Sequence, residues 1–144
     1  MACNSVPVLI LMLSTYLENA AERLALGIPA LPQNANQAKA LTELLENPPS
    51  GEEQELLHLL IDRIPPGVDE AAYVKATWLS AVAQGDTTSP LVSPLEATRL
   101  LGTMVGGYNV AALIELLQHS DAQLAGCAAE GLSRTLLVYD AFNE

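Results

Sequence analysis

A chain of 144 residues can bury one hydrophobic core without cross-links, and half of its residues are hydrophobic. Six basic against seventeen acidic side chains give a formal net charge of −11, so binding to nucleic acid and to acidic membranes is disfavoured. Because aromatic residues are few and alanine and leucine dominate, the composition favours packed helices over a β-sandwich.

The first predicted helix covers about residues 7–26 and ends at Gly27. The apolar run 6–13 at its start follows no lysine or arginine and is too short to span a bilayer. We interpret it as the lead-in to the helix, with a signal peptide as the alternative. The two cysteines, Cys3 and Cys127, belong to no metal-binding motif and need no disulfide, so the cytosol is the expected compartment.

A second predicted helix begins at Asn34 or Asn36, either of which can cap it, and ends at the proline turn 47–51. Ser50 and Glu53 then have the spacing of a capping box, in which each side chain bonds the backbone of the other. The leucine-rich third helix runs from this box to a second proline turn.

The central predicted helix follows Asp69, which can accept a hydrogen bond from its first free amides. Its apolar arc covers more than half of the circumference, a pattern typical of a helix that lies between other helices. We assign Tyr73, Trp78 and Leu79 to the structural core. We expect Lys75 to extend its amine to water from inside the apolar arc.

Ser93 opens a short helix that is expected to end at the glycines 106–107. Asn109 can cap the next helix, and the last one is expected from residues 120–121 to about Tyr139. Because no segment alternates with period two, the prediction is an all-α fold of about six to seven short helices. The repeated proline-containing turns between short helices favour a right-handed HEAT-like stack, with an irregular orthogonal bundle as the alternative.

One glycine-rich segment is a candidate interaction loop, made by Gly102, Gly106, Gly107, Tyr108 and Asn109. It lacks the lysine and hydroxyl of a P-loop and joins two helices, so a helix end followed by a turn is the simpler interpretation. Free amides before the next helix could still receive a carboxylate of a partner. His58 and His119 lie far apart in sequence, with no nucleophile placed beside them. We therefore predict no catalytic residue, no metal ligand and no cofactor-binding residue.

Three segments carry a resemblance to a known family: PPGVDEAAYVKA at 65–76, LLGTM at 100–104 and GGYN at 106–109. They resemble the N-terminal HEAT-like domain of the bacterial aconitase B family. The members of this family are iron–sulfur hydro-lyases of the tricarboxylic acid cycle, and they include 2-methylisocitrate dehydratases. The resemblance covers about residues 12–144, so residues 1–11 are expected to be an N-terminal extension. It implies that the family's cluster ligands and substrate-binding residues lie in parts that this chain does not match.

The resemblance implies a non-catalytic module for protein–protein interaction or oligomerisation. One alternative is an accessory part of an aconitate hydratase whose catalytic domains are elsewhere, and another is an RNA-associated regulatory domain. The expected partner is a second copy, in a homodimer, or an aconitase-type or other metabolic protein, with no nucleic acid and no membrane. We expect a cytoplasmic protein without a [4Fe–4S] cluster of its own, and a self-contact near residues 6–13.

Overall fold

The computed structural model describes residues 6–135, which form seven α-helices, one π-helical turn and no strand. The predicted all-α class is therefore confirmed. The elements are, in chain order, α1 (Val6–Ala25), α2 (Ala35–Glu46), α3 (Glu53–His58), the π-helical turn η1 (Leu59–Arg63), α4 (Glu70–Gln84), α5 (Pro94–Leu101), α6 (Val110–Leu116) and α7 (Ala122–Ser133). None of these helices is long and apolar enough to cross a bilayer.

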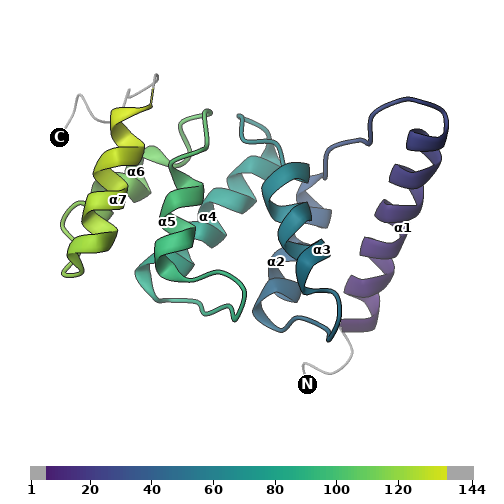
Figure 1. Cartoon of the computed structure of the whole chain (residues 1–144), viewed down its shortest axis with the longest axis horizontal. Helices are drawn as coiled ribbons and strands as arrows, with labels where there is room; N and C mark the ends of the chain where they lie inside the picture. The colour runs from purple at the N-terminus through teal and green to yellow at the C-terminus, as the bar shows by residue number, and fades with distance from the viewer. Residues whose placement is uncertain (1–5, 136–144) are drawn as a thin grey trace.

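The helices follow one another along the long axis of the molecule, from α1 at one end to α6 and α7 at the other (Figure 1). Helix α2 packs against α1 and α4, while α5 packs against α4 and α7. Helix α4 thus lies in the middle, as its broad apolar arc predicted. Whether these helix pairs are HEAT-like repeats stays a prediction.

Local capping explains where several helices begin. Four side chains accept a backbone amide of the first turn: Asn34, Asp69, Ser93 and Asp121. Asp69 and Ser93 were predicted as caps, and Asn34 and Asp121 were each one of two predicted alternatives. At Asn34 the bond is reciprocal, since the Gln37 side chain accepts from the Asn34 amide at 3.0 Å. These bonds span two or three residues, which is why the sequence alone predicted them.

Other predicted helix ends are wrong. No capping box joins Ser50 to Glu53, because Glu52 occupies the cap position and Glu53 accepts from the Gly51 amide at 2.9 Å. Helix α5 ends at Leu101 instead of the glycines 106–107, and α7 ends at Ser133. The expected end at Tyr139 lies outside the described residues. Helix α1 spans Val6–Ala25, and the expected division of the chain after residue 11 stays a prediction.

Helix α4 supplies much of the core, where Trp78 and Leu79 are buried. Two expectations for this helix are wrong. Tyr73 is 57% exposed, so it belongs to the surface and not to the core. Lys75 is only 2% exposed, so its side chain does not extend into water. Helix α4 packs against α2 and α5, and this packing leaves Tyr73 exposed while Lys75 and Trp78 are buried.

Candidate functional site

Two residues of the candidate interaction loop have structural roles. The side chain of Asn109 is fully buried and caps no helix. Its Nδ2 instead donates to the carbonyl oxygens of Leu101 at 2.6 Å and Met104 at 3.2 Å. Gly102 lies against Gly131 of α7, where an added Cβ would stand 3.0 Å from the Gly131 α-carbon. Because Asn109 is fully buried, it is not available to a partner.

The rest of this loop is held against the proline turn that precedes α4. The Val105 amide donates to the Pro66 carbonyl at 2.9 Å, and Gly106 lies against Gly67 with no room for a Cβ. Gly107 adopts a φ of +93°, a conformation that favours glycine. Both connections lie at the upper edge of the molecule in Figure 1.

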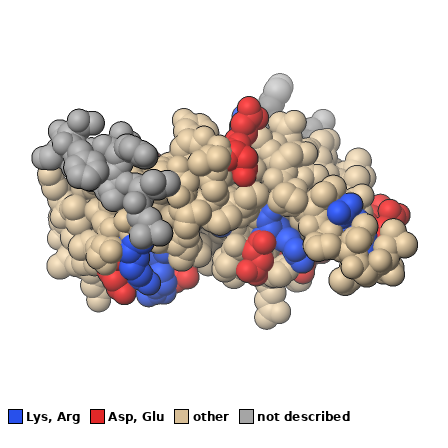
Figure 2. Space-filling view, turned by 90° about the horizontal axis from the view of Figure 1, so that it is seen from above, with Lys and Arg blue, Asp and Glu red and all other residues tan. Residues whose placement is uncertain are grey.

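Tyr108 is the member of the loop that presents a large side chain to solvent. Its hydroxyl donates to the Val68 carbonyl at 2.8 Å, and its ring meets that of Tyr73 edge to face, with the centroids 5.4 Å apart. Val68, Tyr73, Val105 and Tyr108 are all exposed, and we call these four residues the aromatic edge. Seen from above, the molecule shows wide stretches of uncharged surface between few charged side chains (Figure 2).

An open groove of about 300 Å³ begins at Tyr73 and runs between α2 and α4. Its lining is almost wholly apolar on the α4 side, and the residues are Lys39, Thr42, Tyr73, Val74, Thr77, Trp78 and Ala81. We call it the α2/α4 groove. At one end, the indole Nε1 of Trp78 donates to Glu46 Oε1 at 3.0 Å. An exposed apolar groove that continues into an aromatic edge is typical of a protein-contact surface.

A second groove, of about 650 Å³, lies between α5 and α7 and is more polar. Its two arginines already pair with carboxylates on their own helices, Arg99 with Glu96 at 2.6 Å and Arg134 with Glu130 at 3.1 Å. Cys127 also lines this groove, and burial raises the pKa of its thiol although Arg99 opposes the shift. A raised pKa keeps the thiol protonated at neutral pH, so Cys127 is poorly suited to act as a nucleophile.

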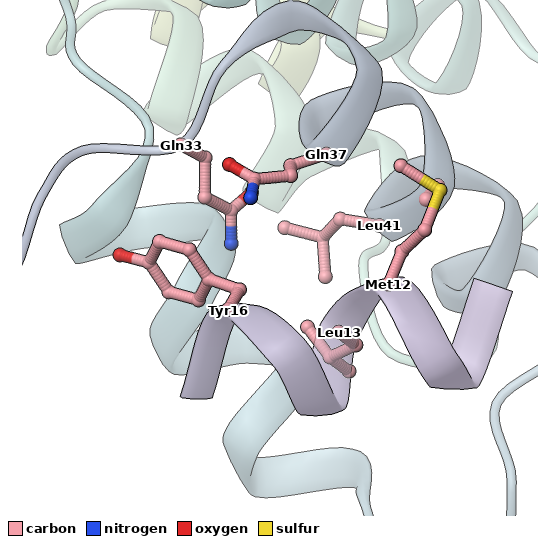
Figure 3. Close-up of a pocket in the computed structure, with 7 residues that line it drawn as sticks. Met12, Leu13, Tyr16, Gln33, Gln37 and Leu41 are labelled. Atoms are coloured by element: carbon pink, nitrogen blue, oxygen red, sulfur yellow. The ribbon is translucent and has the colours of Figure 1, made fainter. Parts of the chain in front are cut away.

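A narrow gap between α1 and α2 contains a buried glutamine. Figure 3 shows the Gln33 side chain directed between Tyr16 and Leu41, and neither of its amide atoms has a hydrogen-bond partner among the described residues. The neighbouring Tyr16 hydroxyl donates to the Leu31 carbonyl at 2.6 Å. Because the gap does not admit a water molecule, it is not a ligand site.

Among the described residues, Lys75 is the ionisable group whose pKa departs most from its ordinary value. Burial lowers the pKa of its amine to about 8, and the carboxylate of Asp62 partly opposes this shift. Asp62 itself bonds His58 Nδ1 at 2.8 Å, one helical turn earlier, and forms no ion pair with Lys75. Within residues 6–135, no three His, Cys, Asp or Glu side chains gather where they could hold a metal ion.

One family model and several curated proteins match nearly the whole chain. A family model described as the Aconitate B N-terminal domain matches residues 15–144. Aconitate hydratase B of Synechocystis is 59% identical over 133 residues, which are 92% of this chain and 15% of the relative. The Salmonella typhimurium and Escherichia coli proteins of that name are 61% and 57% identical over 131 residues, 91% of this chain and 15% of each relative. The chain therefore spans about 15% of the length of these relatives.

Proposed function

Because the chain belongs to the Aconitate B N-terminal domain family, we propose that it is a non-catalytic part of an aconitate hydratase B that makes protein–protein contacts. The observation that carries this proposal is the α2/α4 groove, which opens beside the aromatic edge and leaves apolar side chains exposed. Burying such a surface against another protein is favourable because it removes apolar area from water.

The partner in this proposal is a second copy of the chain or another part of an aconitase-type enzyme. A formal charge of −11 opposes contact with the phosphates of RNA, so a regulatory RNA-associated role is the weaker alternative. A cytoplasmic location belongs to the same proposal.

The iron–sulfur chemistry of the aconitase family does not fit the side chains of this chain. A [4Fe–4S] cluster is held by cysteine thiolates, and the sequence contains two cysteines, Cys3 and Cys127. Cys127 lies in the groove between α5 and α7, where burial raises the pKa of its thiol and so disfavours the thiolate that iron needs. We therefore assign hydration and dehydration to parts of the enzyme that this chain does not include.

The proposal is tested by assaying the purified chain with citrate and isocitrate before and after anaerobic treatment with iron and sulfide. We expect no turnover and no broad visible absorption of an iron–sulfur cluster. The full-length Escherichia coli aconitate hydratase B, treated in the same way, is the positive control. Turnover by the isolated chain would show that the non-catalytic assignment is wrong.

A further inference from the structure

The two halves of helix α1 are attached to the rest of the fold in different ways. In the second half, the Tyr16 hydroxyl donates to the Leu31 carbonyl at 2.6 Å, and Arg23 Nε donates to the Pro29 carbonyl at 2.8 Å. Residues 6–13 carry only apolar side chains, and none of these is fully buried. The side chains of the first half therefore hold it in place through partly covered apolar contacts alone.

The junction between these two halves is a weak point of the helix. Ser14 Oγ donates to the Ile10 carbonyl at 2.9 Å, and Thr15 Oγ1 donates to the Leu11 carbonyl at 2.9 Å. A hydroxyl that bonds the carbonyl four residues earlier slightly destabilises a helix and often bends it. The match to the Aconitate B N-terminal domain model begins at residue 15, so the part of α1 before the junction also lies outside the family match.

This first half of α1 closes over a buried amide. Met12 and Leu13 stand on one side of the narrow gap, and Gln33 reaches into it from the connection between α1 and α2 (Figure 3). The Gln33 side chain is 3% exposed, and neither Oε1 nor Nε2 has a hydrogen-bond partner among the described residues. Burying an unpaired amide is unfavourable, so the closed position of α1 carries a cost that opening would remove.

We propose that residues 6–13 form a lid that opens at Ser14 and Thr15 while the rest of the chain stays folded. Opening admits water to the amide of Gln33 and uncovers Leu41 of α2, which lines the same gap. The closed position gains from the covering of apolar surface and the open position gains from hydration of the amide, so the two lie close in free energy. The lid is separate from the α2/α4 groove, which lies on the α4 side of α2.

Amide hydrogen exchange of the full chain, followed residue by residue by NMR, measures the opening. We expect the amides of residues 10–13 to exchange at least about tenfold faster than those of residues 18–22, which lie in the same helix beyond the junction. Gln33→Met removes the unpaired amide and keeps an unbranched side chain. It should slow the exchange of residues 10–13 by about tenfold, because the closed lid then covers no unpaired polar group.

A variant at the junction tests the lid without a change at Gln33. Ser14→Ala combined with Thr15→Ala removes both hydroxyls and introduces a better helix former, so the exchange of residues 10–13 should slow about fivefold. This variant keeps the inference testable if Gln33→Met disturbs the fold. Gln118→Met makes the same chemical change as Gln33→Met at an exposed residue beyond α6, and it should leave the exchange in α1 unchanged.

Four results would overturn the inference. The first is exchange of residues 10–13 that is no faster than that of residues 18–22, which would mean that α1 detaches as a whole. The second is unchanged exchange in Gln33→Met with intact helical circular dichroism, which would mean that the helix start frays without uncovering Gln33. The others are a junction variant without effect and an equal slowing in Gln118→Met. None of them bears on catalysis or on partner contacts, so the proposed function is tested separately.

Discussion

Gly106 packs so closely against Gly67 that a methyl group on Gly106 would overlap the Gly67 carbonyl. This contact joins the loop between α5 and α6 to the proline turn before α4, two segments about forty residues apart in the sequence. The bond from the Val105 amide to the Pro66 carbonyl lies beside it. The aromatic edge depends on this junction, because Tyr108 reaches Val68 across it.

Gly106→Ala should therefore destabilise the fold. The new Cβ meets backbone atoms that cannot rotate away, so we expect a loss of about 3 kcal/mol in the free energy of unfolding, at the upper end of the usual cost of overpacking. Gly67→Ala is the matched control, because nothing lies within 4 Å of a Cβ at that residue. Urea unfolding of both variants measures the difference, and equal losses would contradict the close approach.

Two glycines of α7, Gly131 and Gly126, should also respond in opposite ways to substitution by alanine. Gly131→Ala places a methyl group 3.0 Å from the Gly102 α-carbon, where α5 and α7 cross. We expect it to cost about 1–3 kcal/mol. Gly126→Ala lies on the same helix with open space around its Cβ, and it should stabilise the protein by about 0.5–1 kcal/mol because alanine favours helix. Thermal unfolding should move in opposite directions for the two variants. A stabilising Gly131→Ala would show that the helices are not this close.

Trp78→Ala should cost about 3–5 kcal/mol, as the loss of a large buried aromatic side chain does. This is a large part of the roughly 5–15 kcal/mol that stabilises a typical domain. Tyr73→Ala, five residues earlier on the same helix, removes an exposed ring and should cost less than about 1 kcal/mol. Chemical unfolding followed by circular dichroism compares the two variants, and the ranking fails if Tyr73→Ala is the more damaging change.

Lys75 should make stability rise with pH above neutrality. Its amine has a pKa of about 8 in the folded protein, against about 10.4 in an unfolded chain. Between these values the unfolded state binds more protons than the folded state, so the free energy of unfolding increases with pH. Below pH 8 the buried charge costs roughly 3 kcal/mol, and Lys75→Met should recover much of this at pH 7.

Urea unfolding at pH 7, 8, 9 and 10 tests the role of Lys75. The slope of stability against pH should be less positive in Lys75→Met than in the original chain. Comparison of the two is needed because burial raises the pKa values of Tyr16 and Cys127, whose titration at high pH has the opposite sign. Lys39→Met removes an exposed amine and should leave the profile unchanged. Identical profiles for the original chain and Lys75→Met would show that the amine stays well hydrated in the folded protein.

The sequence alone predicted the features that depend on near neighbours in the chain. The caps at Asn34, Asp69 and Ser93 use a side chain and an amide three residues apart, so their geometry is present in the local sequence. The all-α class follows from helical spacing of apolar residues in every long segment. The segments PPGVDEAAYVKA and GGYN were sufficient to indicate the family.

The remaining features depend on residues that are distant in the sequence. The apolar arc of α4 was too broad to show which flank would be covered, and only tertiary packing left Lys75 buried and Tyr73 exposed. Asn109 matched the pattern of a helix cap, but the Leu101 and Met104 carbonyls at the end of α5 take its amide instead. The α2/α4 groove, which Lys39 and Trp78 line from opposite helices, exists because two helices separated by some thirty residues lie side by side. Side-chain spacing along one helix shows which residues share a face, but only the packing of other helices decides whether that face is buried, exposed or part of a groove.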